Sequence, residues 1–470
     1  MKKIVSSLVF VYCFLPLLAQ QNLGIRNSNF AGIQAALLNP SSIADSKLKW
    51  DVNILSVGVV YDNNFLYVPK GTIPFLGFKS IIKGIKNQDI FYTNFDPAQP
   101  DKRYNFTLSS EILGPSFHVE IMKKHVVGFT MLNRSYANIR NFSGHLAESA
   151  FDYLKNKGLW YAPFHDNSTK LNGMNWLEYG LEYATVLYKK DNRELTGGVT
   201  LKYLRGIAAA YVKNTNLTYR VADTSQLIFT NANLEYGRTD YDSYSSRHLN
   251  HGHGFGANIG FTYIVLKEAG ANNGKPVVKK WNGPYQSNYI YKIGLSFIDL
   301  GSINFNKMAS SFQLRSDSAN FLNWHQSNFT NNLQVDRALS AVFYQGDSSK
   351  SLTSDHFRMG LPAAISIQAD WNLYKNFFIN ATIVKGFGHG NRQGVVRPDV
   401  YSITPRFESK WFDASIPISL LYYGIWRPRI GLAVRAGYFF FGGDALGGLL
   451  GLHNFQGADF YAGAHFFITR

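Results

Sequence analysis

The 470-residue chain has a single cysteine, Cys13, close to its amino terminus. A small secreted fold held together by disulfides is therefore excluded, because such folds need several paired cysteines. The same count excludes a cysteine nucleophile in the body of the protein. Beyond the first 20 residues, no run reaches the roughly 18 apolar residues that a membrane-spanning helix needs.

Recognisable catalytic motifs are also absent: the sequence has no Gly-x-Ser-x-Gly, His-Glu-x-x-His or Gly-x-x-x-x-Gly-Lys-Ser/Thr. His251 and His253 stand between glycines with no carboxylate nearby, so we interpret them as part of a loop rather than as metal ligands. His118 and His465 fall on the polar faces of predicted strands, but no serine can be assigned to either of them as a catalytic nucleophile. We expect no catalytic residues, no metal and no cofactor, and a hydrolase is the least favoured function.

Residues 1–20 have the pattern of a secretory signal peptide. A basic start, Met1-Lys2-Lys3, precedes an almost entirely apolar run over residues 4–18 and a small residue, Ala19. The run is short for a membrane anchor. We therefore expect export by the Sec pathway and cleavage near residue 20.

Apolar and polar residues alternate along the last third of the chain, residues 359–470. The apolar face of residues 363–373 consists of Ile365, Ile367, Ala369, Trp371 and Leu373. A period of two marks a strand whose two faces have different surroundings. Similar segments cover residues 377–383, 401–408, 414–422, 430–440 and 458–468.

Two architectures give such alternation: a soluble sandwich of two sheets and a transmembrane barrel. Many of these segments run about 10–14 residues, whereas strands of globular proteins have about 5–6 and a tilted strand crosses a bilayer in about 9–11. The length favours the barrel, and a membrane protein without spanning helices has to be a closed barrel. The 36 Phe and 28 Tyr suit aromatic girdles at the membrane interfaces. We predict an all-β, antiparallel transmembrane barrel over residues 49–470, with long extracellular loops.

The strand number follows less directly. Alternation yields 13 strands, but single-chain bacterial barrels have an even number, so we predict 14. Adjacent short turns around Lys410 and Trp426 would leave the carboxyl terminus on the wrong side of the membrane. At least one boundary after residue 398 or within residues 62–103 must therefore be wrong. The predicted large insertions are residues 140–173, 208–251 and 302–357, with helical turns expected in residues 145–156 and 333–344.

Charged residues occupy the polar faces of these strands in mid-strand. Both signs occur, which leaves two interpretations open: a network that ties the wall to a plug, or a polar pathway for a solute. The predicted lumen-lining residues are Glu178, Glu182, Lys202, Lys292, Asp370, Arg406, Glu408, Arg435 and Asp459.

Residues 21–48 do not alternate. They contain a run of small and apolar residues that ends at Asn39-Pro40-Ser41, where proline disfavours a continuing helix. This segment resembles the N-terminal segment of barrels of the fatty-acid-transporter type, and also that of accessory barrels of the type IX secretion system. The resemblance implies a plug folded into the lumen. An unstructured periplasmic tail is the alternative.

Together with the stretch 401–408, Tyr-Ser-Ile-Thr-Pro-Arg-Phe-Glu, these features resemble an uncharacterised outer-membrane β-barrel family of Bacteroidota, a domain of unknown function. The resemblance implies the outer membrane of a Gram-negative bacterium. We hypothesise a plugged channel for uptake or export of small hydrophobic molecules. The alternative, an accessory or shuttle barrel that binds secretion-system components, rests on the resemblance to the accessory barrels and on the long insertions. The net charge of +16 suits outer-membrane lipid and lipopolysaccharide, and we expect no nucleic-acid partner for an exported chain.

Overall fold

The computed structural model describes residues 22–72, 90–99, 102–122, 124–152, 154–240, 250–267, 271–272, 275–276, 289–322, 329–390, 392–422 and 426–470. The predicted signal peptide, residues 1–20, lies outside the described residues. Within the described ranges, no helix is both long and apolar enough to cross a membrane.

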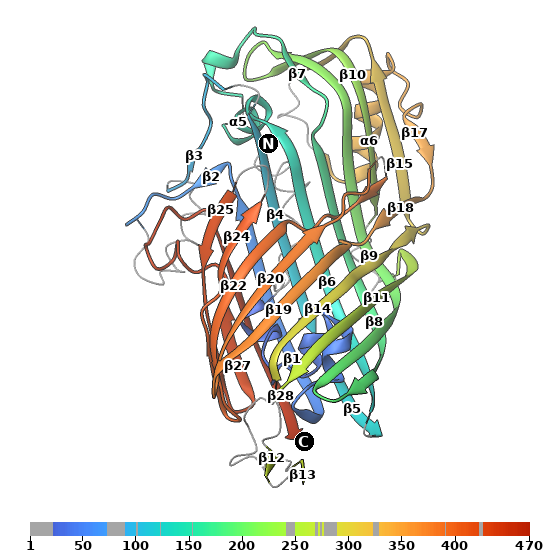
Figure 1. Cartoon of the computed structure of the whole chain (residues 1–470). Helices are drawn as coiled ribbons and strands as arrows, with labels where there is room; N and C mark the ends of the chain where they lie inside the picture. Colours follow the sequence, from blue (N-terminus) through green and yellow to red (C-terminus); the bar gives the residue numbers. More distant parts are fainter. Residues whose placement is uncertain are drawn as a thin grey trace.

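The described chain forms one closed antiparallel barrel of 14 strands, as predicted. Several barrel strands are interrupted, so more segments than strands carry labels (Figure 1). Closure comes from β1 (Leu48–Asn63) and β28 (Gly457–Thr469), which pair from Leu48↔Thr469 to Asp62↔Gly457. The wall therefore has no free edge where the two ends of the barrel sequence meet.

The other barrel segments follow in chain order. They are β4 (Arg103–Leu113), β5 (Ser116–Met122), β6 (His125–Ser143), β8 (Lys170–Lys190), β9 (Arg193–Val221), β10 (Gln226–Thr239), β11 (Gly252–Leu266), β14 (Tyr289–Phe305), β15 (Ala309–Ser316), β16 (Ala319–Leu322), β17 (Leu352–Ser354), β18 (Phe357–Gly360), β19 (Ala364–Tyr374), β20 (Phe377–Gly386), β21 (Gln393–Gly394), β22 (Asp399–Glu408), β23 (Phe412–Ser415), β24 (Ile418–Tyr422), β25 (Trp426–Ile430), β26 (Leu432–Ala436) and β27 (Phe439–Gly443).

Short strands and helices complete the description. They are β2 (Leu66–Tyr67), β3 (Tyr92–Thr93), β7 (Phe164–Asp166), β12 (Ala271–Asn272), β13 (Lys275–Pro276), α2 (Leu23–Arg26), α3 (Ile33–Ala36), η1 (Pro40–Ile43), α5 (Gly144–Phe151), η2 (Lys157–Leu159) and α6 (Asn332–Phe343). We call the end that holds the carboxyl terminus the turn end, and the opposite end the loop end (Figure 1).

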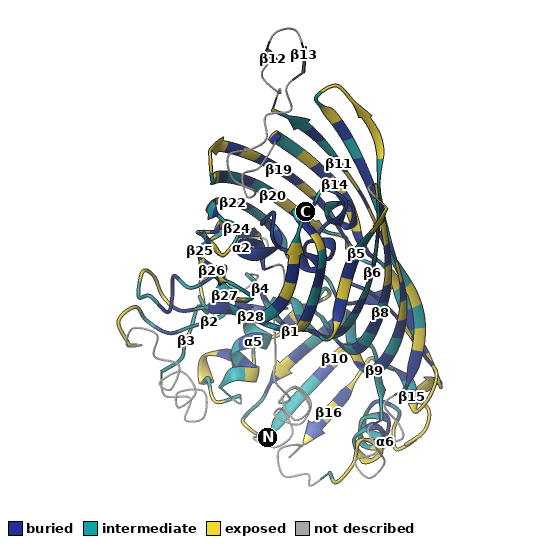
Figure 2. Ribbon diagram, turned by 90° about the horizontal axis from the view of Figure 1, so that it is seen from below, coloured by how far each residue is buried: buried dark blue, intermediate teal, exposed yellow. Residues whose placement is uncertain are grey.

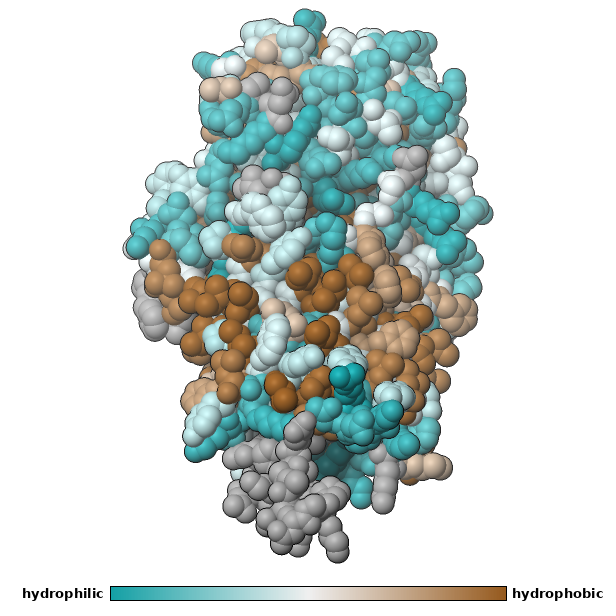
Figure 3. All heavy atoms as spheres, viewed as in Figure 1, coloured by the Kyte–Doolittle hydropathy of each residue, from teal (hydrophilic) through white to brown (hydrophobic). Residues whose placement is uncertain are grey.

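The alternation places apolar side chains outside and polar ones inside. On β19, Leu373 is 66% exposed, whereas Ser366 and Asp370 on the other face are 0% and 2% exposed. On the face drawn in Figure 3, the exposed apolar residues form a belt across the turn-end half of the barrel, with polar surface above and below it. A belt of this kind is what a lipid-facing barrel surface requires.

At the loop end, the wall continues beyond the belt as an extended sheet. β9 pairs with β11 in its first half and with β10 in its second half, and β10 pairs in turn with β15 and β16. The predicted insertion 208–251, for which we expect β-structure of its own, is largely strand where it is described. Helix α6 lies where helix was expected and packs through Phe343 on this sheet, and α5 confirms the other expected helical turn.

The predicted strand 430–440 and the predicted turn at Trp426 are both wrong. The chain turns at Gly437 and Tyr438, between β26 and β27, and Gly437 has φ +61°, a conformation that glycine adopts without strain. Trp426 instead lies in β25 and pairs with Tyr422 of β24. The turn reverses the alternation, so Phe440 is buried rather than outward-facing. This split supplies the fourteenth strand.

One smaller prediction also needs correction. His253 and its neighbouring glycines lie in β11 and not in a loop, and only His251 precedes the strand. No group of three or more His, Cys, Asp or Glu residues in the described ranges is placed to hold a metal ion.

Candidate functional site

Residues 22–47, which we call the N-terminal segment, lie inside the barrel toward its turn end (Figures 1 and 2). The segment consists of α2, α3 and η1 joined by tight turns, and nearly every side chain in it is buried. Ile33 and Ile43 are completely buried against apolar wall residues such as Leu132 and Ala184. A segment this deeply covered is part of the barrel's interior packing.

The Asn39-Pro40-Ser41 turn fits the wall closely. The Asn39 side chain caps η1 by accepting from the Ser41 amide, and proline stands at the first helical position. Asn39 also donates to Gln368 Oε1 at 3.1 Å, and Ser41 Oγ lies 2.7 Å from Thr262 Oγ1. A Cβ on the wall residue Gly198 would lie 2.5 Å from the carbonyl carbon of Pro40, so only glycine allows this approach.

Helix α3 is anchored to the wall by Asp51 of β1. One carboxylate oxygen accepts the Ile33 amide at 2.8 Å, and the other bonds His465 Nδ1 of β28. Gly32 precedes the helix with φ +58°, and a Cβ there would strike the Asp51 carboxylate. The anchor therefore lies at the seam where the barrel closes.

The central ion-pair cluster joins the segment to five wall strands and one loop. Its members are Arg26, Glu111, Arg134, Glu178, Lys202, Asp299 and Arg397. Asp299 lies 2.7 Å from Arg134 Nη1, 2.7 Å from Lys202 Nζ and 2.6 Å from Arg397 Nη2. It stands at a bulge of β14 with φ +57°, an unusual conformation for a residue other than glycine.

The loop 387–398, which we call the inner loop, folds into the lumen from the loop end. Val395 is completely buried among apolar wall residues, and the Val396 amide donates to Asn138 Oδ1 at 2.8 Å. Arg397 then reaches Asp299. Arg134 connects Asp299 to Glu111, and Glu111 binds Arg26, so a continuous chain of ion pairs runs from the inner loop to the N-terminal segment.

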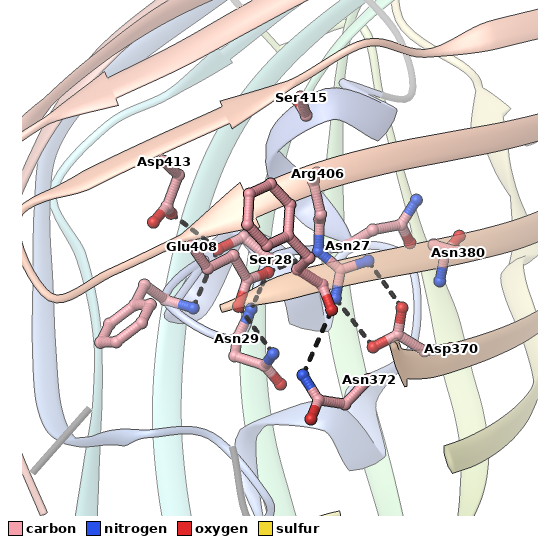
Figure 4. A network of polar contacts seen from close by, with 12 residues as sticks. Asn27, Ser28, Asn29, Asp370, Asn372, Asn380, Arg406, Glu408, Asp413 and Ser415 are labelled. Carbon is pink, nitrogen blue, oxygen red and sulfur yellow. Dashed lines mark hydrogen bonds and ion pairs between the residues drawn. The ribbon is translucent and has the colours of Figure 1, made fainter. Parts of the chain in front are cut away.

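The lower ion-pair cluster holds the segment from the opposite wall (Figure 4). Arg406 binds both oxygens of Asp370, at 2.6 and 2.7 Å, and also pairs with Glu408. Glu408 accepts from the Asn29 amide and side chain at 3.1 and 2.7 Å. Asp413 accepts from Ser28 Oγ at 2.9 Å, and Arg435 binds Asp413 at 2.7 Å.

The predicted lumen residues all lie on the inner side of the wall. Glu178 and Lys202 belong to the central cluster, and Asp370, Arg406, Glu408 and Arg435 to the lower cluster. Lys292 contacts Asp45 of the N-terminal segment at 3.0 Å. Asp459 accepts the Ala445 amide at 3.0 Å, and Glu182 is buried on β8.

Sequence reasoning missed six wall and loop charges: Asp51, Glu111, Arg134, Asp299, Arg397 and Asp413. Alternation could have found Glu111 and Arg134, because their strands were predicted. It could not have found Asp299, which follows a bulge, or Arg397, which lies in a loop without periodicity.

Lys47 ends the N-terminal segment at the turn end. Its backbone carbonyl accepts the Arg470 amide at 2.9 Å. Burial, with Lys292 nearby, lowers the pKa of Lys47 to about 8. A charged Lys47 therefore opposes the buried position of the segment.

The free space beside the segment is small and polar. A cavity of about 40 Å³ separates it from the wall, and among its lining residues are Asn29, Lys292, Gln368 and Asn380. That is room for about one or two water molecules, far below the roughly 300 Å³ of a typical ligand pocket.

An apolar layer, which we call the lumen apolar cluster, also lies on the inner face. Its members are Tyr136, Met174, Trp176, Leu204, Ala209, Tyr211, Ile303, Phe305, Ala309, Phe357, Met359, Leu361 and Val395. On β6, β8 and β9, the cluster residues lie closer to the loop end than the ion-pair residues Arg134, Glu178 and Lys202.

Comparison with known proteins gives a family but no activity. The model of a family described as "Family of unknown function (DUF5723)" matches residues 40–444. No curated protein matches the chain.

Several solved structures have a similar course of the chain at very low sequence identity. The Pseudomonas putida toluene transporter TodX is 7% identical with a TM-score of 0.41, over 94% of this chain and 95% of TodX. The Ralstonia pickettii toluene transporter TbuX is 9% identical with a TM-score of 0.39, over 93% of both chains. A Pseudomonas aeruginosa FadL homologue is 8% identical with a TM-score of 0.40, over 92% of this chain and 93% of that one.

Proposed function

Because the chain belongs to DUF5723, a family of unknown function, its activity has to be inferred from its own lumen, and we propose an outer-membrane channel for small hydrophobic molecules. In this proposal the N-terminal segment and the inner loop close the channel, and they must shift to pass a molecule in either direction. The turn end faces the periplasm and the loop end faces outward.

The exposed apolar belt supports the membrane location. Side chains such as Leu181 and Leu373 are 65% and 66% exposed, and each has a buried polar neighbour in the sequence. Exposing this much apolar surface to water would cost about 25 cal/mol for each Å². Lipid removes that cost, and the closed wall leaves no strand edge unpaired in the membrane.

The observation that carries the proposal is the lumen apolar cluster. An all-polar lumen would suit ions or sugars, whereas aromatic and sulfur-containing side chains such as Trp176, Phe305 and Met359 suit an apolar solute. Val395 of the inner loop fills part of this layer. Movement of the inner loop would therefore expose an apolar surface inside the barrel to the outside.

Proteoliposomes that contain the purified protein test the proposal. We expect them to take up a lipophilic fluorescent probe faster than protein-free liposomes. Deletion of residues 22–47 is expected to change the uptake rate, because it removes the material that fills the periplasmic half of the lumen.

Two point variants make this experiment decisive. Asp51→Asn weakens the anchor of α3, together with the bond from Asp51 to His465, and should change uptake in the same direction as the deletion. The Asp355→Asn variant alters an exposed carboxylate at the loop end and should behave like the unmodified protein. Uptake that equals that of protein-free liposomes for every folded variant would refute the channel.

A scaffold or shuttle for protein secretion is the second candidate. It is favoured by the sheet that extends beyond the belt, where β10, β15, β16 and α6 share their own apolar core around Phe229, Phe321 and Phe343. Crosslinking in cells followed by mass spectrometry should then recover secretion components with the protein. If secretion components are crosslinked to the protein and the proteoliposomes take up no lipophilic probe, the scaffold is favoured over the channel.

A further inference from the structure

The turns at the periplasmic end carry a concentrated positive charge, which we call the basic ring. Its members are Lys124, Lys189, Lys190, Arg193, Lys375 and Lys410. They come from four different hairpins, so they are spread around the barrel and do not form one patch. Five of the six are exposed, and Lys410 is half-buried.

Few carboxylates balance these charges. On the same turns, Asp191 is the exposed acidic residue among those described, and the buried Glu194 pairs with Lys189 at 2.6 Å. At the loop end, by contrast, cations such as Lys350 are mixed with exposed carboxylates such as Asp347 and Asp355. The basic ring is therefore a local feature and not a reflection of the net charge alone.

Each part of the ring is directly next to the apolar belt. Leu187 and Tyr188, 54% and 52% exposed, precede Lys189. Leu373 and Tyr374, 66% and 61% exposed, precede Lys375. Residues of this kind place an apolar stem or ring in the acyl region and a charge at the level of the headgroups.

Cation–π contacts fix two of these positions. Lys375 Nζ lies 4.9 Å from the centre of the Tyr374 ring, and Lys410 Nζ lies 5.3 Å from that of Trp411. Trp411 is itself 51% exposed. The aromatic ring holds each ammonium group at the edge of the belt.

We propose that the basic ring binds the phosphate groups of anionic phospholipids in the periplasmic leaflet of the membrane. The circular distribution and the adjacent apolar side chains fit a lipid annulus better than a single protein partner, which would need a contiguous patch. The ring thereby fixes the depth of the barrel and holds the turns around the N-terminal segment. This inference needs the membrane location but not transport activity.

Native mass spectrometry in mild detergent tests the proposal, with phosphatidylglycerol and phosphatidylcholine of identical acyl chains as probes. We expect the protein to retain phosphatidylglycerol preferentially. The combined variant Lys190→Gln, Arg193→Gln, Lys375→Gln and Lys410→Gln should lose at least tenfold of that preference, since one surface cation contributes about fivefold to binding of anionic lipid. Soluble glycerol phosphate should not compete at equal concentration, because it lacks the acyl chains that the belt holds.

A matched variant with four cations removed from the loop end provides the control: Lys155→Gln, Lys157→Gln, Lys307→Gln and Lys350→Gln. It changes the net charge equally and should keep the lipid preference. Heat-modifiable migration on gels shows that both variants are folded. An unchanged preference in the ring variant, or an equal loss in the control, would overturn the proposal. So would ring-dependent binding of a polyglutamate peptide without any lipid preference, which would indicate an acidic protein partner.

Discussion

At the scale of single residues, the interior depends on a few close approaches between the N-terminal segment and the wall. Gly198 lies against Pro40, Gly32 lies against Asp51, and Asn39 reaches wall residues on two strands. None of these contacts has a sequence signal apart from the Asn39-Pro40-Ser41 turn itself. The sequence could predict where the segment turns, but not which glycines make room for it, because a glycine's neighbours depend on strand register.

Gly198→Ala should loosen the segment. The added methyl group would overlap the Pro40 carbonyl, and overpacking of this kind costs about 1–3 kcal/mol. We expect cleavage within residues 22–47 by proteinase K to become about 5- to 100-fold faster, since about 1.4 kcal/mol corresponds to a factor of ten. Gly173→Ala is the matched control, because a Cβ there would have its nearest neighbour at 3.8 Å. Equal cleavage of the two variants would contradict the close fit.

Lys47 should make the stability of the N-terminal segment's buried position depend on pH. Its pKa is about 8 inside the barrel and lower than its usual value of 10.5. Between these pH values, the segment binds more protons when it is released than when it is buried in the barrel. The free energy that favours the buried position therefore increases as the pH rises from 8 to 10.5, and it is smallest below pH 8. Proteinase K should therefore cleave the segment more slowly at pH 9.5 than at pH 7.5, after correction for its activity on an unfolded substrate. Lys47→Met should flatten this dependence and Lys49→Met should retain it, and a flat profile in the unmodified protein would contradict the assignment.

At the scale of elements, alternation predicted most strands and failed where the chain turns tightly or bulges. The turn at Gly437 and Tyr438 is only two residues long and is flanked by apolar residues on both sides. The alternation of the sequence therefore continues across it without a visible break. The bulge at Asp299 shifts the alternation of β14 in the same way. The inner loop has no period, and its position inside the barrel follows from tertiary contacts such as those of Val395, Val396 and Arg397.

The inner loop and the N-terminal segment should be coupled through the central ion-pair cluster. Removing one partner of a buried ion pair costs about 3–5 kcal/mol, and we expect less for Arg397→Gln, because Asp299 keeps Arg134 and Lys202. Hydrogen exchange of residues 387–398 should still rise about tenfold or more. Arg392→Gln, an exposed change in the same loop, should leave the exchange rate unchanged.

The double variant Arg26→Gln/Arg397→Gln measures the coupling itself. If the chain of ion pairs transmits strain, the combined effect on protease sensitivity of the segment should differ from the sum of the single effects by about 0.5 kcal/mol or more. Strict additivity of the single effects would show that the inner loop and the N-terminal segment act independently.

At the scale of the whole molecule, a closed wall surrounds two kinds of filling. The turn-end half contains the N-terminal segment and its ion pairs, and the next layer contains the lumen apolar cluster. The fold class and the strand number could be predicted from strand length, alternation and the rule of even numbers. The apolar layer could not be predicted, because it forms only when β6, β8, β9, β14 and β18 come together.

The most direct test of the account locks the N-terminal segment to the wall. Ser41 Oγ and Thr262 Oγ1 are 2.7 Å apart, so Ser41→Cys/Thr262→Cys should form a disulfide. The only native cysteine, Cys13, lies in the predicted signal peptide. Ser311→Cys/Thr353→Cys, whose hydroxyls are 3.2 Å apart, cross-links the loop-end wall as a control. We predict that oxidation of the first pair lowers probe uptake in proteoliposomes and that a reductant restores it, with no effect for the control pair. Full uptake with the first disulfide completely formed would contradict the account.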